Sequence, residues 1–322
     1  MKPAEILFNK FSLNLQNISF YLGFELEEKY QKEGYICPLS FKIFSKEGLS
    51  TNWADQLTIE HVPPESLSGK ALCLTNRISN SKSGHTLDIS VLNHIKIRES
   101  NEGISGLKTK VFIEGVKMDG YLDFMNKEKP QFNFSYYKRH QGITRVENKM
   151  LTDKTINLKF TIPVDNRDTL ISFLRIAYLY AFGHLGYSLI FGVSKLVNPN
   201  FDLIRRQINN PEKFLIDDII LINKDLENFQ AGLYIVYEPI ECRSLFVVFD
   251  IVTVNKKWRY GLFLPGPDDF GFKALNNIKL LLNNKKKIDF VYHNIPDIDL
   301  TDPIDCMYYV RYWSHKVGFF ND

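Results

Sequence analysis

Alternating apolar and polar positions in the first third of the chain predict two short strands followed by a helix. Residues 56–62 alternate up to a histidine, and residues 70–74 form a second short strand-like run. Residues 79–97 contain no proline and place Leu87, Val91 and Ile95 at helical spacing. We therefore expect a ββα unit between about Ile36 and Arg98, preceded by a strand or short helix within residues 1–33.

The pattern beyond residue 100 predicts a larger domain that mixes strands and helices. Strand-like runs rich in Val, Ile and aromatic residues cover residues 107–134, 155–163, 231–237, 244–254 and 258–264, with a helix expected over 272–282. No internal repeat or low-complexity segment interrupts them. We expect an α+β protein with two domains, residues 1–100 and residues 101–322, the second containing an antiparallel β-sheet.

One apolar segment, Leu170–Val193, is long enough to span a bilayer. It contains Arg175 and His184, whose charged forms are costly at mid-bilayer, and it lacks a flanking basic cluster. We predict a long buried helix with Asp168 as its N-cap, and no membrane partner.

Composition indicates the expected cellular compartment more clearly than it indicates the class of binding partner. A net charge of +3 permits a nucleic-acid partner without arguing for one. The four scattered cysteines (Cys37, Cys73, Cys242 and Cys306) indicate reduced thiols, and the first residues lack the apolar core of a secretory signal. These features predict a cytoplasmic protein.

The segment Leu57–Asp88 concentrates residues that could hold a divalent cation and activate a water. It resembles the HNH endonucleases whose core reads E-H-x-x-P-E-S-L-G-G-K, then L-T-C-x-x-C-N, a small-residue turn and an aspartate. The corresponding run here is Glu60, His61, Pro64, Glu65, Ser66, Leu67, Ser68, Gly69, Lys70, Leu74, Thr75, Asn76, Ser79, Asn80, Gly84 and Asp88.

This resemblance implies a metal-dependent phosphodiesterase site on a ββα-metal finger. Glu60 and Asn80 would be metal ligands, and their hard oxygens suit Mg²⁺ or Mn²⁺. His61 would be the general base, because a neutral imidazole titrates near operating pH. His85 would be a further ligand or a phosphate contact.

Cations around this segment are candidates for nucleic-acid binding. Lys70, Arg77 and Lys82 surround the predicted site and could neutralise phosphates. The aromatic and basic segment 132–140 is either a surface on which bases stack or an ordinary half-buried strand.

Relatives of this type carry two CxxC knuckles that bind a structural zinc through four thiolates. The corresponding positions here are Cys37 and Ser40 in the first knuckle, and Asn76 and Ser79 in the second. Only one of the four thiols remains, and neither a hydroxyl nor an amide replaces a zinc thiolate. We therefore expect no structural zinc.

Two functions follow from these residues. The first is an HNH endonuclease that hydrolyses nucleic acid, with DNA as the expected substrate, in a restriction or phage-defence role. The second is a catalytically inactive HNH-fold binding or scaffolding protein, whose C-terminal domain contacts a partner protein or a nucleotide signal. The lost thiols favour the second function, as does Lys70 or Ala71 where many HNH proteins have an asparagine that orients the base. The retained Glu60, His61 and Asn80 favour the first.

Overall fold

A computed structural model describes most of the chain, in nine segments. They are residues 2–50, 55–113, 116–123, 131–135, 143–152, 158–161, 166–192, 196–284 and 290–317. The protein combines helices with antiparallel sheets, which confirms the predicted α+β class. It forms two compact units, with Met1–Asp88 and Leu170–Asp322 in unit 1 and Ile89–Thr169 in unit 2. This division differs from the predicted boundary at residue 100, because the chain returns after residue 169 to share a core with the N-terminal residues.

The first element is a 20-residue helix, α1 (Pro3–Leu22), where the sequence predicted a strand or short helix. Its buried side chains Phe8, Phe11, Leu15 and Ile18 recur at helical spacing. The short elements α2 (Glu28–Gln31), β1 (Tyr35–Ile36) and β2 (Ile43–Phe44) follow.

The predicted ββα order is present in unit 1, although its identity as an HNH finger stays a prediction. Strands β3 (Leu57–Val62) and β4 (Lys70–Asn76) pair antiparallel and lead into α3 (Arg77–Ser83). A π-helical turn (Gly84–Asp88) then continues into α4 (Ile89–Asn101). Gly69 closes the β3–β4 turn, where a Cβ would lie 1.5 Å from the carbonyl oxygen of Pro63. No larger residue fits there.

The long apolar segment forms two helices, α6 (Asn166–Leu185) and α7 (Tyr187–Phe191). They are separated by Gly186, whose φ of 59° lies in the left-handed region that favours glycine. Asp168 lies in the first turn of α6 and is therefore not its N-cap. Of the helices in the described segments, none has the length and apolarity needed to cross a membrane.

A five-stranded antiparallel sheet of order β13-β10-β11-β12-β9 forms the other half of unit 1. Its strands are β9 (Leu221–Ile222), β10 (Gly232–Glu238), β11 (Ser244–Val252), β12 (Lys257–Pro265) and β13 (Val291–Asn294). The remaining helices of unit 1 are α8 (Pro199–Asn209), α9 (Gly271–Asn283) and α10 (Tyr308–Val317). The sequence predicted β10, β11, β12 and α9 but not α8 or α10.

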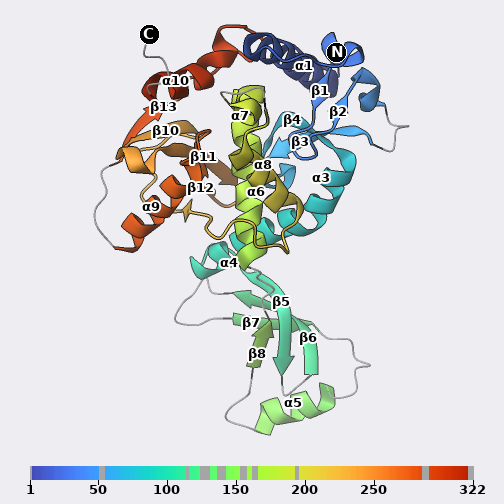
Figure 1. Cartoon of the computed structure of the whole chain (residues 1–322). Helices are drawn as coiled ribbons and strands as arrows, with labels where there is room; N and C mark the ends of the chain where they lie inside the picture. Colours follow the sequence, from blue (N-terminus) through green and yellow to red (C-terminus); the bar gives the residue numbers. More distant parts are fainter. Residues whose placement is uncertain are drawn as a thin grey trace. The chain divides into compact units, whose positions relative to one another are not determined.

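Helix α6 lies between this sheet and the ββα segment (Figure 1). On one side, the ring of Phe173 packs 4.6 Å from that of Tyr260 on β12. Near the other end of α6, Phe182 stacks 4.9 Å from Phe11 of α1. Because α6 contacts both halves of unit 1, it is the central element of the core.

Unit 2 contains α4 and a four-stranded antiparallel sheet of order β7-β6-β5-β8. The strands are β5 (Leu107–Ile113), β6 (Val116–Asp123), β7 (Gln131–Ser135) and β8 (Leu158–Thr161), and α5 spans Ile143–Thr152. The strands predicted within residues 107–134 and 155–163, and their antiparallel pairing, are thereby confirmed. Val111, Ile113 and Met118 from the sheet pack with Val146 of α5.

Asn14 of α1 is a fully buried polar residue that connects two distant backbone segments. Its Oδ1 accepts the backbone N–H of Tyr187 at 2.8 Å, and its Nδ2 donates to the carbonyl of Leu300 at 3.0 Å. Asn17, one turn later, donates one partly buried hydrogen bond, to the carbonyl of Thr301.

We expect Asn14→Ala to lower the free energy of unfolding by about 2–4 kcal/mol, because it leaves two buried backbone groups without partners. The matched variant Asn17→Ala removes one partly buried bond and should lose about 1 kcal/mol or less. Urea unfolding of both variants measures the difference. Equal losses in the two variants would contradict the role given to Asn14.

Candidate functional site

Glu60 and His61 end strand β3 and point to different environments. The β3–β4 register shifts between them, so that Glu60 pairs with Cys73 and His61 with Ala71. Glu60 is 4% exposed and faces the interior, whereas His61 is only half-buried. The predicted ligand and the predicted base therefore lie on opposite sides of the strand.

The Glu60 carboxylate is bound on both of its oxygens. Oε1 accepts a charge-assisted hydrogen bond from Nη2 of Arg175 at 2.7 Å, and Oε2 accepts one from Oγ1 of Thr75 at 2.9 Å. Arg175 comes from the middle of α6 and is 2% exposed. This ion pair is closed to solvent.

Two further side chains complete what we call the Arg175 cluster: Arg175, Glu60, Asn80 and Asp88. Nη1 of Arg175 lies 3.0 Å from Oδ1 of Asp88, and Nη2 lies 3.4 Å from Oδ1 of Asn80. Nδ2 of Asn80 donates to Oγ1 of Thr58 at 3.1 Å. Three of the residues that carry the family resemblance thus meet around one guanidinium.

Burial sets the acid–base properties of the cluster. Desolvation raises the pKa of Glu60, while the Arg175 charge and the Thr75 hydrogen bond act in the opposite direction. Burial likewise raises the pKa of Asp88 against the effect of Arg175. In both carboxyl groups the charge of Arg175 therefore opposes the effect of burial on the pKa and favours the ionised form.

The predicted metal ligands do not fit Mg²⁺ or Mn²⁺ in this arrangement. Mg²⁺ is usually bound by one or two carboxylates and keeps several waters. The oxygens of Glu60 and Asn80 instead face the Arg175 guanidinium, and the Glu60 carboxylate is closed to water. Across the described segments, no group of three or more His, Cys, Asp and Glu side chains could hold a metal ion.

The remaining predicted site residues do not converge on this cluster. The ring of His61 forms no hydrogen bond with any residue that the structure describes. Lys70 and Arg77 are exposed, and Arg77 donates to Oε1 of Gln56 at 3.3 Å. The side chains of Lys82 and His85 lie outside the described residues, as does most of the segment 132–140.

The residues at the two knuckle positions are neighbours in space, and a hydrogen bond joins them. Sγ of Cys37 accepts the backbone N–H of Asn76 at 3.2 Å. Oδ1 of Asn76 accepts the N–H groups of Ile78 and Ser79, at the start of α3. Oγ of Ser40 accepts the N–H of Lys42. The Asn76 side chain thus satisfies donors at the helix N-terminus, at a position where the HNH endonucleases that the segment resembles have a zinc thiolate.

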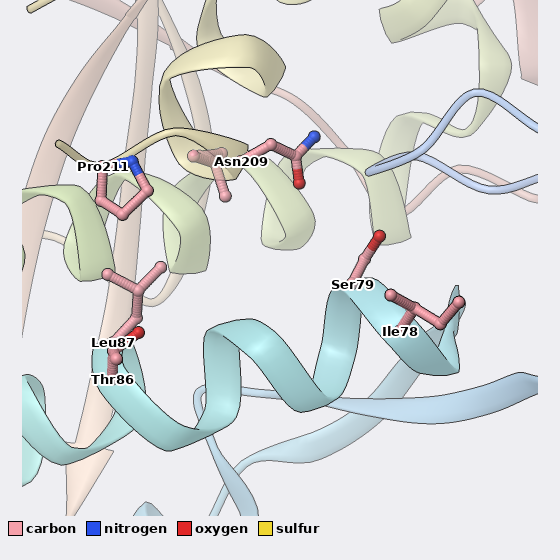
Figure 2. Close-up of a pocket in the computed structure, with 7 residues that line it drawn as sticks. Ile78, Ser79, Thr86, Leu87, Asn209 and Pro211 are labelled. Carbon is pink, nitrogen blue, oxygen red and sulfur yellow. The ribbon is translucent and has the colours of Figure 1, made fainter. Parts of the chain in front are cut away.

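A small cavity of about 210 Å³ lies beside α3, between the helical segment Ile78–Leu87 and the end of α8 (Figure 2). Its lining residues are Ile78, Ser79, Thr86, Leu87, Ile208, Asn209 and Pro211. None of these described residues is charged, so they offer no cation for a phosphate.

The residue at the centre of the site, Arg175, is not among the predicted site residues. In the sequence Arg175 stands out only as a charge that opposes membrane insertion, whereas in the structure it is the ion-pair partner of Glu60. A single arginine within a continuous apolar helix is itself a signal, because a buried charge needs an opposite charge. The buried acids of the motif were the available partners.

Comparisons with protein-family models, curated proteins and solved structures gave no match. The resemblance to the HNH endonucleases therefore rests on the residues quoted above.

We expect Arg175→Met to lower the free energy of unfolding by about 3–5 kcal/mol near neutral pH, because it leaves buried carboxyl groups without their cation. Asp88→Asn should cost about 1 kcal/mol, since the Asp88 side chain is 31% exposed and water can replace part of the contact. Urea unfolding measures both. A loss below about 1 kcal/mol for Arg175→Met would contradict the central role of the pair.

The same variant should become sensitive to pH. Without Arg175, the pKa of Glu60 rises further above its unfolded value, so the folded state holds a proton that the unfolded state releases. Stability is then retained near pH 5 and lost as pH rises toward about 8, by up to about 1.4 kcal/mol per pH unit. Unfolding of Arg175→Met at both pH values measures this. Adding Glu60→Gln to that variant should remove most of the slope; an unchanged slope would assign it to another group.

Proposed function

We propose that this protein is a binding or scaffolding protein built on an HNH-like ββα core. The observation that carries the proposal is the position of the Arg175 guanidinium, between the oxygens of Glu60, Asn80 and Asp88. In this proposal a fixed positive charge from α6 takes the place that a catalytic cation would have, and the site has become part of the core.

Energetics support this assignment. A divalent cation that binds Glu60 must displace Arg175. Because Arg175 is only 2% exposed, its charge would then remain buried without the Glu60 counterion. Separating a buried ion pair in this way costs several kcal/mol. Mg²⁺ also gives up its waters reluctantly, and the Glu60 carboxylate is closed to water.

The environment of His61 points in the same direction. A general base needs its imidazole held in one tautomer, usually by a hydrogen bond to the second ring nitrogen. Within the described part of the chain nothing forms such a bond with His61. Lys70 and Ala71, which stand where an orienting asparagine is expected, are both exposed.

A partner would contact the C-terminal part of the chain in this proposal. Large apolar side chains stand exposed there, among them Ile304 and Leu280, which are 63% and 62% exposed. Exposed apolar groups of this kind occur at ligand and protein interfaces. The proposed partner is a protein or a nucleotide signal.

Nuclease activity is the second candidate, and one observation favours it. Glu60, His61 and Asn80 gather within one ββα unit as the resemblance requires, and the half-buried His61 is accessible from solvent. This candidate would hydrolyse nucleic acid, with DNA as the proposed substrate, and would require Arg175 to leave the acidic side chains.

One experiment separates the candidates. Supercoiled plasmid, single-stranded DNA and RNA are incubated with the full chain and with His61→Ala, each in Mg²⁺ or Mn²⁺. We expect no cleavage by the parent beyond that by His61→Ala. We also expect the thermal midpoint of the parent to be unchanged by Mn²⁺, because a ligand raises it only by binding the folded state. Metal-dependent cleavage by the parent that His61→Ala lacks would establish the nuclease and overturn our proposal.

A further inference from the structure

Arg243 is a second buried arginine of unit 1, in an environment unlike that of Arg175. It lies between the 3₁₀ turn Ile240–Cys242 and β11, and it is 5% exposed. Its guanidinium carbon stands 4.5 Å above the ring of Trp313 on α10. Nη2 donates to the backbone carbonyl of Trp313 at 3.3 Å. These contacts fix the plane of the guanidinium.

The charge of Arg243 has no ion-pair partner within the described segments. Its buried Nε forms no hydrogen bond, and its Nη1 forms none with the residues described. Burial lowers the pKa of Arg243, and Asp268 is the strongest opposing influence. The Asp268 carboxylate has other partners, because Oδ1 accepts the N–H of Phe270 and Oδ2 accepts Nε1–H of Trp313.

Arg205 provides a contrast within the same unit. Its guanidinium also stacks on a ring, 4.3 Å from that of Phe41, but it lies 2.6 Å from Oδ1 of Asp202. Arg175 likewise contacts two carboxylates. A buried cation without such a partner costs free energy in the unliganded protein and favours binding of an anion.

A cavity of about 350 Å³ lies against Arg243. Its lining residues are Ile240, Glu241, Arg243, Asp268, Phe270, Lys273, Ala274 and Asn277. Ile240 and Phe270 are largely exposed and give it an apolar rim. The volume is within the range of small-molecule sites, which combine apolar walls with a few placed polar groups.

We propose that this cavity binds a small molecule that carries a singly charged oxyanion, such as a carboxylate, and an apolar body. The guanidinium of Arg243 holds the oxyanion, because arginine presents paired N–H donors that match carboxylate geometry. The apolar body rests on Ile240 and Phe270. The described lining residues include two cations, Arg243 and Lys273, and two acids, Glu241 and Asp268, so a monoanion suits them better than a dianion. This inference does not rest on the proposed function.

The test uses the full chain and three probes with one apolar body: cyclohexanecarboxylate, cyclohexyl phosphate and the neutral cyclohexylmethanol. Trp313 contacts Arg243, so binding is followed by tryptophan emission and by the thermal midpoint. We expect saturable binding of the carboxylate and at least about tenfold weaker binding of the alcohol, which lacks the charge-assisted hydrogen bonds. Tighter binding of the phosphate than of the carboxylate would support the oxyanion site but overturn the preference for a monoanion.

Variants locate the site. Arg243→Met should weaken carboxylate binding at least about tenfold, because it removes the cation and keeps most of the side-chain volume. Without ligand, its thermal midpoint should equal or exceed that of the parent, since an unpaired buried charge is gone. The matched control Arg205→Met should leave binding within about twofold, because Arg205 is not among the cavity residues.

Phe270→Ala supplies an independent variant, because the exposed ring contributes little to the core. It should weaken binding about threefold or more through lost apolar contact. The proposal is overturned if neither anion saturates by about 100 mM, a bound weaker than ordinary fragment affinities. It is also overturned if Arg243→Met and Phe270→Ala both bind like the parent.

Discussion

The structure of unit 1 depends on one buried ion pair, between Arg175 in the middle of α6 and Glu60 at the end of β3. Each residue alone would be a serious defect, because an isolated charge in an apolar interior is far less stable than in water. Together they fix the position of α6 along β3, and Asp88 and Asn80 add contacts from the helical segment that follows β4. The helix could not slide along the strand without separating these charges.

Much of the fold could be predicted from the sequence, because its signals are local. The alternation before His61 gave β3, and the regular apolar spacing gave the following helical segment. Helix α1 was expected only as a strand or short helix, because Asn9, Asn14 and Asn17 interrupt its apolar positions. The unit boundary was missed for a different reason: nothing local to Leu170 indicates that α6 packs against residues more than 80 positions earlier.

In the candidate site, too, the contact that the sequence pattern did not predict is made by a residue distant in the chain. Motif spacing predicted that Glu60 and Asn80 share one site, and both contact Arg175, but the spacing could not identify the guanidinium as the cation beside their oxygens. A metal ion and a guanidinium can each neutralise a buried carboxylate, and the motif identifies only the carboxylates and not their counterion. Likewise, Asn76 stands at a knuckle position, yet only the structure assigns its amide to the start of α3.

The division of unit 1 into two stretches of sequence has a consequence for biosynthesis. Glu60 leaves the ribosome 115 residues before Arg175. Domains commonly fold as they are made, from the N-terminus onward. Here the β3–β4 hairpin carries the Glu60 carboxylate on its inner face and lacks Arg175 until the whole of unit 2 has been translated. That charge disfavours premature collapse of the hairpin onto any apolar surface other than the helix that carries its counterion. Glu60 thus disfavours incorrect apolar contacts of the hairpin until α6 has been synthesised.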